Sequence, residues 1–248
     1  MIKLIDIYKS FGEQKVLTGL NLEIEDGKTT VIIGRSGGGK SVLLKHIIGL
    51  LRPDKGQVLV DDVDITKLND RDLNEIRKKF GMLFQEAALF DSMTVGDNVA
   101  FPLREHTKMK ENEIKQIVAD RLKAVGLTGV EDKIPAELSG GMRKRVGLAR
   151  AIALHPQIVL FDEPTTGLDP VMSEAINQLI IETQKNFNLT CVVISHDIES
   201  MYKISHKIAM LYEGKIIEYG TPDEIKASIN PITVQFLSGN INGPIKIL

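Results

Sequence analysis

Near its N-terminus the chain carries the sequence Gly34-Arg35-Ser36-Gly37-Gly38-Gly39-Lys40-Ser41. This stretch fits the phosphate-loop pattern of a glycine, four residues, a second glycine, a lysine and a serine or threonine. An apolar, β-branched run at residues 29–33 precedes it, and residues 42–51 follow with apolar side chains at helical spacing. A strand, a glycine loop and a helix in this order predict a cradle for phosphate groups, whereas a plain connecting turn would not need these flanks.

The residue types in the loop suit a nucleotide anion. Glycines let backbone N–H groups point inward without a Cβ clash, and the following helix adds its positive N-terminal end. We expect Lys40 to reach the β- and γ-phosphates and the Ser41 hydroxyl to ligate Mg²⁺. The nucleotide-binding residues predicted in and beside the loop are Gly34, Arg35, Ser36, Gly37, Gly38, Gly39, Lys40, Ser41 and Val42.

Length and charge limit the classes of protein to consider. The chain has 248 residues and a formal net charge of −2, which suits one large α/β domain with room for an inserted subdomain and gives no general attraction to nucleic acid. A single cysteine, Cys191, excludes an internal disulfide and suits a reducing compartment. No signal peptide opens the chain, and no apolar run approaches the roughly 20 residues that span a bilayer. We expect a soluble, cytoplasmic protein that meets a membrane only through a partner.

The remaining pattern outlines the order of elements. Residues 2–24 predict short strands, residues 86–155 are largely helical in pattern, and buried-strand patterns return at residues 158–161 and 191–194. Apolar runs on both sides of Glu213-Gly214 predict a hairpin. The helical part is therefore interpreted as an insertion, roughly residues 86–155, within an α/β core.

Two carboxylates follow the strand predicted at residues 158–161. Asp162 could hold a Mg²⁺-bound water beside a phosphate loop, and Glu163 could act as general base on an attacking water. The alternative is structural, because strands often end in acidic residues before a turn. The pair alone does not separate these two interpretations.

A further motif, Leu138-Ser139-Gly140-Gly141-Met142, precedes an alanine-rich helix. Ser139 is a candidate N-cap, and the glycines would let an anion approach the helix N-terminus, so that this end could meet a γ-phosphate. A tightly packed helix start is the alternative. The basic residues that follow, Arg143, Lys144 and Arg145, are interpreted as a solvated helix face rather than as a nucleic-acid contact.

Single residues elsewhere add weaker signals. His196 just past a strand could reach a γ-phosphate, Gln85 could bring an amide oxygen to Mg²⁺, and Phe11 could stack on an adenine ring. Each has an ordinary structural alternative, because a lone histidine or aromatic is more often a surface or core residue.

Taken in order, these motifs resemble the nucleotide-binding subunit of ABC transporters over nearly the whole chain. The resemblance implies a P-loop NTPase (RecA-like) core with an N-terminal antiparallel β subdomain and an inserted helical subdomain, all within residues 1–238, and ATP with Mg²⁺ as cofactors. It assigns adenine stacking to Phe11 with Val16 beside it, and Mg²⁺ binding to Ser41, Gln85 and Asp162. It implies a homodimer that sandwiches two ATP molecules.

The same resemblance assigns the groups at the chemical step. Glu163 would be the base and His196 the γ-phosphate switch, while Ser139, Gly140 and Gly141 would bind the γ-phosphate of ATP held by the other subunit. Asp169 would lie at the dimer interface.

Two residues depart from the family pattern. Val42 stands where a threonine is usual, and Met142 replaces the usual glutamine. We expect modest effects on nucleotide affinity from these two departures.

Longer stretches are similar to the ATPases of Mla-type lipid transporters. They are residues 40–45, 85–90, 98–106 and 235–239, together with Gly243-Pro244 and the Met142 version of the glycine motif. This resemblance implies an MlaE-like permease, an MCE-domain protein reached through that permease and, in some members, a STAS-domain protein. The cargo would be phospholipid or another hydrophobic molecule, and the subunit would sit peripherally on the inner face of the cytoplasmic membrane.

Three other functions are alternatives to lipid transport. A soluble ABC ATPase of DNA repair or translation usually carries a coiled-coil insertion or a second ATPase domain, for which 248 residues leave no room. A non-catalytic nucleotide-binding module is disfavoured because Glu163 is present. A transporter ATPase for another cargo, such as amino acids, stays open because no residue here needs to touch the cargo.

Two apolar segments predict protein contacts. Residues 87–93, with Ala87, Leu89 and Phe90, are too apolar for a free loop and predict contact with the permease, the alternative being packing inside the helical subdomain. The tail, residues 239–248, ends with Ile245, Ile247 and Leu248 and either joins the second subunit or folds back on its own domain.

Overall fold

The computed structural model describes residues 1–246 and divides the chain into two compact units. The first unit contains residues 1–68 and the chain from Ile194 onward, and the second contains residues 69–193. Ile247 and Leu248, named above as candidate contact residues of the tail, lie outside the described residues.

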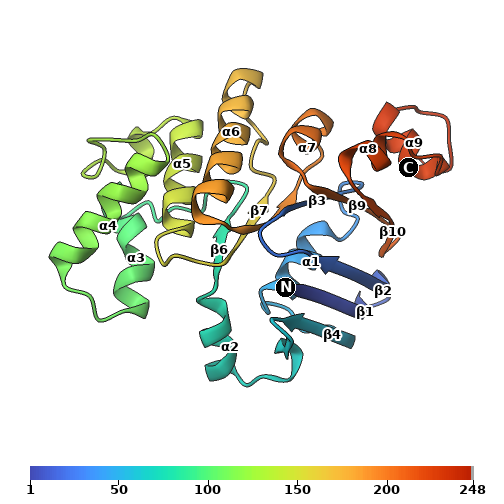
Figure 1. Ribbon diagram of the computed structural model, residues 1–248, viewed down its shortest axis with the longest axis horizontal. Coiled ribbons are helices and arrows are strands. Elements are labelled where there is room, and N and C mark those ends of the chain that lie inside the picture. The colour runs from blue at the N-terminus through green and yellow to red at the C-terminus, as the bar shows by residue number, and fades with distance from the viewer. Residues whose placement is uncertain (247–248) are drawn as a thin grey trace. The chain divides into compact units, whose positions relative to one another are not determined.

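An antiparallel sheet of order β2-β1-β4-β5 forms one layer of the first unit (Figure 1). Ile2 of β1 pairs with Ile24 of β2 on one side and with Val60 of β4 on the other, and all three side chains are fully buried. This is the N-terminal antiparallel β subdomain that the sequence predicts. Its strands are β1 (Ile2–Phe11), β2 (Gln14–Ile24), β4 (Lys55–Val60) and β5 (Val63–Asp64).

A second sheet of this unit holds the strand that leads into the glycine loop. In β3 (Thr29–Ile33) every residue is buried, and it runs parallel to β9 (Lys207–Tyr212). A tight turn at Glu213 (φ 47°) and Gly214 (φ 76°) joins β9 to β10 (Lys215–Gly220), which confirms the predicted hairpin. The helices of this unit are α1 (Lys40–Ile47), η1 (Ile65–Lys67), α7 (Ile198–Ile204), α8 (Pro222–Lys226) and α9 (Pro231–Ser238).

The second unit combines buried strands with a group of helices. Strands β6 (Phe80–Leu83) and β7 (Ile158–Asp162) are parallel, and β8 (Thr190–Ile194) lies beside β7. Helices α3, α4 and α5 pack on one another, as their green ribbons in Figure 1 show, and they fall within the stretch predicted to be helical. The helices are α2 (Asp70–Arg77), α3 (Val95–His106), α4 (Glu111–Ala124), η2 (Pro135–Glu137), α5 (Gly140–Ala151) and α6 (Pro170–Phe187).

The tail begins after α9, which ends at Gly239 with φ 64°. Gln235 of α9 exchanges two hydrogen bonds with Ile245: the Ile245 N–H donates to Gln235 Oε1 at 2.7 Å, and Gln235 Nε2 donates to the Ile245 carbonyl at 3.3 Å. For Ile245 the structure therefore shows the fold-back alternative.

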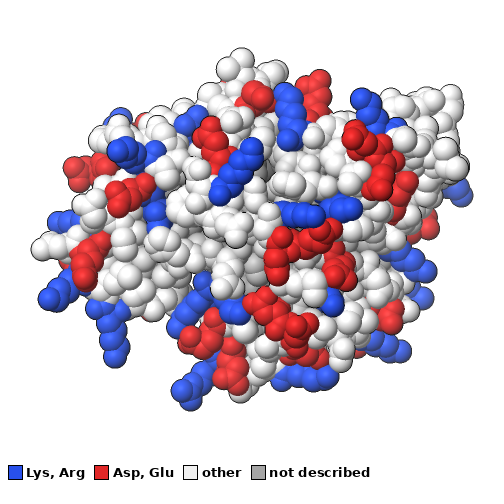
Figure 2. Space-filling view, viewed as in Figure 1, with Lys and Arg blue, Asp and Glu red and all other residues white. Residues whose placement is uncertain are grey.

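The surface carries both signs of charge, as expected for a chain with a formal net charge of −2. Basic and acidic side chains lie interspersed on the face that Figure 2 shows. Within residues 1–246, none of the helices combines the length and hydropathy of a membrane span.

Acid should destabilise the first unit through His46 on α1. This side chain is 1% exposed, its Nδ1 lies 2.7 Å from the Val42 carbonyl, and its Nε2 has no hydrogen-bond partner among the described residues. Burial lowers the pKa of His46, and Lys9 lowers it further, although Val42 and Asp54 act in the opposite direction. The folded pKa is then below the unfolded value of about 6.5, so the unfolded chain takes up the proton first.

The stability that neutral His46 contributes is therefore complete above about pH 6.5 and is lost as the pH falls, by up to about 1.4 kcal/mol per unit. Urea unfolding at pH 7.5 and 5.5 should show a steeper loss for the wild-type chain than for His46→Leu. Equal losses in the two proteins would contradict this role of His46.

Candidate functional site

The glycine loop lies in the first unit between β3 and α1. Gly34, Gly37 and Gly39 have positive φ angles of 147°, 73° and 98°, which favour glycine, and a Cβ at Gly34 would strike the Leu211 carbonyl. Gly39 is the N-cap residue of α1 and has no side chain with which to cap it, and the first turn of the helix carries no acidic residue. The N–H groups at this helix end therefore suit an anion.

Lys40, the first residue of α1, is held inside the loop. Its side chain is 5% exposed, and Nζ donates to the carbonyls of Gly34 at 2.8 Å and Arg35 at 2.9 Å. The Lys40 ammonium is therefore held against the backbone of the glycine loop. This is the position expected for a lysine that binds phosphate.

A cavity of about 870 Å³ opens beside the loop. Its lining includes residues 35–38 of the loop, residues 14–16 at the start of β2 and residues 212–215 of the β9–β10 turn. The structure thus brings Val16 together with Arg35, as the predicted nucleotide site requires. Phe11 is not among these lining residues; it ends β1 with 48% of its surface exposed, and the Lys9 ammonium lies 5.6 Å from its ring centre.

His196 lies in the same unit as the loop. The neighbouring Ser195 N–H donates to the Ile32 carbonyl of β3 at 3.3 Å, which anchors the segment next to the end of the strand that enters the loop. Asp197 caps α7 by accepting hydrogen bonds from the N–H groups of Glu199 and Ser200. His196 is exposed at this strand end.

In the second unit, the parallel pair β6–β7 brings two predicted positions to one sheet edge. Leu83 of β6 pairs with Phe161 of β7, so Asp162, the last residue of β7, and Gln85, two residues beyond β6, lie at the same end of the two strands. Glu163 has φ 50°, and its carboxylate oxygen Oε2 accepts a hydrogen bond from the Thr166 hydroxyl at 2.9 Å.

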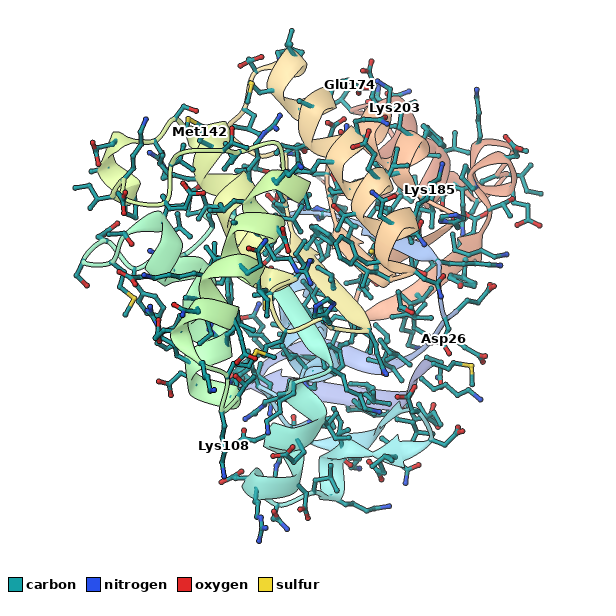
Figure 3. The ribbon with its side chains drawn as sticks, turned by 60° about the vertical axis from the view of Figure 1, so that its left-hand side comes forward. Asp26, Lys108, Met142, Glu174, Lys185 and Lys203 are labelled. Atoms are coloured by element: carbon teal, nitrogen blue, oxygen red, sulfur yellow. The ribbon has the colours of Figure 1, made fainter. Side chains whose placement is uncertain are left out.

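The glycine motif forms the start of α5, near Met142 in Figure 3. The Ser139 hydroxyl accepts a hydrogen bond from the Met142 N–H at 3.3 Å, which confirms the predicted N-cap. A Cβ on Gly141 would meet the terminal methyl group of Met172 on α6, so the Met172 side chain packs against this glycine. Asp169 caps α6, accepting from the N–H groups of Val171 and Met172, each at 3.0 Å.

The interpretation of the basic residues after this motif as a solvated face is wrong for Lys144, which is buried, while Arg143 and Arg145 are half-buried. Arg143 donates to the Leu138 carbonyl at 2.9 Å, and Arg145 to the Val125 carbonyl at 3.0 Å. Lys144 is buried and donates to two carbonyls further along the chain. These long side chains turn inward because α5 starts beside loops whose carbonyl groups need donors.

Sequence reasoning missed the residues that fix the segment after Gln85. Arg150 of α5 donates to the carbonyls of Ala87 at 2.6 Å and Ala88 at 2.7 Å, and Asn98 Oδ1 accepts from the Phe90 N–H at 2.8 Å. The available signal was Arg150, which stands among the small and apolar residues of the second half of α5. Ala87 is fully buried, so for this residue packing within the unit replaces the predicted partner contact.

Comparison with known proteins identifies the family. Residues 17–166 match the family model described as ABC transporter. The chain is 46% identical over 244 residues to the probable ribonucleotide transport ATP-binding protein mkl of Mycobacterium leprae, covering 98% of this chain and 70% of that protein. It is also 46% identical over 235 residues to the intermembrane phospholipid transport system ATP-binding protein MlaF of Haemophilus influenzae, covering 95% of this chain and 89% of that one.

A solved structure supports the same relationship. An ATP-binding cassette determined as a dimer in a post-hydrolysis state, bound to ADP and Pi, superposes with a TM-score of 0.82 at 33% identity, over 90% of this chain and 99% of that chain. The predicted ABC-type fold is confirmed by this match. The chain therefore belongs to the ABC transporter family and is one of its ATP-hydrolysing subunits.

Proposed function

We propose that the chain powers a transporter that moves phospholipid or another hydrophobic molecule between membranes, working as a homodimer on an MlaE-like permease at the inner face of the cytoplasmic membrane. The observation that carries this proposal is the 46% identity to an intermembrane phospholipid transport ATP-binding protein over 95% of this chain. An MCE-domain protein and a STAS-domain protein are the further partners that this relationship implies.

In the proposed site, the glycine loop binds the phosphates of ATP and Phe11 stacks on its adenine. Ser41, Gln85 and Asp162 offer a hydroxyl, an amide oxygen and a carboxylate, and these hard oxygen donors fit Mg²⁺. When bound, Mg²⁺ neutralises charge on the phosphates. Glu163 accepts a proton from the attacking water, and His196 contacts the γ-phosphate.

Each composite site is completed by the second subunit. Ser139, Gly140 and Gly141 at the N-terminus of α5 would meet the γ-phosphate of ATP held by the partner chain. Asp169 would lie between the two chains, in addition to capping α6. We extend the proposed dimer contact to the exposed start of the tail, where Ile241 is 70% exposed, and leave out Ile245, which folds back on its own chain.

A second cargo has an observation in its favour, because the mkl relative carries the name of a ribonucleotide transport protein. Copurification from detergent should separate the two. We expect the tagged chain to bring a permease with it, and extracted phospholipid to appear in the mass spectrum of that complex. A complex that carries ribonucleotide and no lipid would favour the second cargo.

A negative charge introduced at Leu89 should separate the chain from its permease. Leu89 is half-buried and the neighbouring Phe90 is 42% exposed, while Arg150 and Asn98 hold the backbone on both sides. Leu89→Glu should therefore leave the fold and nucleotide binding intact and abolish permease copurification. Leu50→Glu, at a 51% exposed position in the first unit, is the matched control and should copurify normally. A folded Leu89→Glu chain that still brings the permease would contradict this contact.

A further inference from the structure

One buried lysine holds the backbone that follows Glu163. Lys144 Nζ donates to the Pro164 carbonyl at 2.8 Å and to the Thr166 carbonyl at 2.6 Å, and the residue is only 5% exposed. Lysine rarely gives up contact with water in this way unless its ammonium has fixed partners. The two carbonyls are such partners, and both belong to the turn that begins at Glu163.

Thr166 passes this constraint on to Glu163. Its hydroxyl donates to Glu163 Oε2 at 2.9 Å, and its N–H donates to the Glu163 carbonyl at 3.3 Å. Thr166 is thus held by Lys144 through its own carbonyl and holds both the backbone and the carboxylate of Glu163. With φ 50°, Glu163 occupies the left-handed region that a non-glycine residue adopts only when its surroundings impose it.

Charge supports the same arrangement. Burial lowers the pKa of the Lys144 ammonium, whereas the carboxylates of Glu86 and Glu163 act in the opposite direction. The negative charge of Glu163 thus favours the charged form of Lys144, the same lysine whose hydrogen bonds hold the turn after Glu163. The helix that carries Lys144 is α5, whose first residues are the glycine motif.

We propose that Lys144 is a positioning residue for ATP hydrolysis, which orients Glu163 through Pro164 and Thr166 and ties it to the start of α5. This inference rests on the proposed role of Glu163 as general base. Because the glycine motif at the start of α5 serves the partner's ATP, the Lys144 link would also connect the two composite sites within one chain. A shift of α5 on contact with the partner's nucleotide would then be transmitted to the base.

The test compares kcat with nucleotide binding in the full chain. Lys144→Met keeps the length of the side chain and removes the ammonium. We expect kcat for ATP to fall about 10- to 100-fold, the range found when the hydrogen-bond partners of metal-ligating residues are removed, with the Kd for ATP changed less than about threefold. Thr166→Val removes the hydroxyl and should lower kcat in the same way, while Thr166→Ser keeps it and should restore kcat.

Arg145→Met is the matched control, because Arg145 lies on the same helix and also donates to a carbonyl, that of Val125 at 3.0 Å. It should lower Tm without a selective loss of kcat. Wild-type kcat in Lys144→Met would overturn the inference, and so would a loss of kcat in Thr166→Val that Thr166→Ser shares. If Lys144→Met fails to fold, the Thr166 pair decides the question.

Glu163→Gln, measured in parallel, distinguishes a failure of the positioning role of Lys144 from a failure of the general-base role of Glu163. An inactive Glu163→Gln chain beside a fully active Lys144→Met chain overturns only the positioning role. A Glu163→Gln chain with wild-type turnover overturns the base itself, and the positioning role fails with it.

Discussion

Replacing Glu163 with glutamine is expected to abolish ATP turnover and leave ATP binding intact. The amide cannot take a proton from the attacking water, and general-base catalysis is worth about 10²- to 10⁴-fold in rate. Glutamine keeps the size of the side chain, and its amide oxygen can still accept the hydrogen bond from the Thr166 hydroxyl. Phosphate release gives the turnover, and titration with ATP gives the Kd.

Two further variants define what the result means. Glu174→Gln, on the exposed part of α6 labelled in Figure 3, removes the same charge elsewhere and should turn over ATP normally. Lys40→Ala should instead weaken nucleotide binding itself, because Lys40 lies inside the glycine loop. Near-normal hydrolysis by the Glu163→Gln chain would show that another group acts as the base.

The second large effect is the loss of ATPase activity when Ser139 is replaced by arginine. We expect this substitution to damage the ATP site of the partner subunit and not the site in its own chain. A homodimer of Ser139→Arg should be inactive, because the arginine blocks the approach of the partner's γ-phosphate to the start of α5. A homodimer of Lys40→Ala should also be inactive. In a mixed dimer both defects fall in one composite site and the other site is intact. Mixing the two chains should therefore restore about a quarter of the wild-type rate, since half of the dimers are mixed and each has one working site.

Ser139→Thr is the control for this experiment, because threonine retains a hydroxyl that can accept from the Met142 N–H. It should stay active, and thermal unfolding should show that Ser139→Arg is folded. Wild-type activity in the Ser139→Arg homodimer would contradict the proposed role in trans.

Local features of the site could be predicted from the sequence because neighbouring residues determine them. The glycine loop, the Ser139 cap and the hairpin at Glu213-Gly214 each depend on a few consecutive residues with particular φ angles or side-chain hydrogen bonds. Each of these is present in the structure where the sequence indicated it.

The inward direction of the basic residues on α5 could not be predicted in the same way. Lys144 donates to carbonyls about twenty residues further along the chain, and Arg150 to carbonyls more than sixty residues earlier. The pattern of charges along a helix does not reveal these carbonyl partners, because only tertiary packing brings them close to the helix. The burial of Ala87 has the same origin, since Ala87 packs against the distant Gly147 of α5 and its carbonyl accepts a hydrogen bond from Arg150.

The most direct test is transport by the chain together with its copurified permease in vesicles that contain a fluorescent phospholipid. We expect ATP to drive movement of the phospholipid between membranes with the wild-type chain, and the Glu163→Gln chain to give none. A wild-type complex that hydrolyses ATP, leaves the phospholipid in place and moves a ribonucleotide instead would contradict the proposed function.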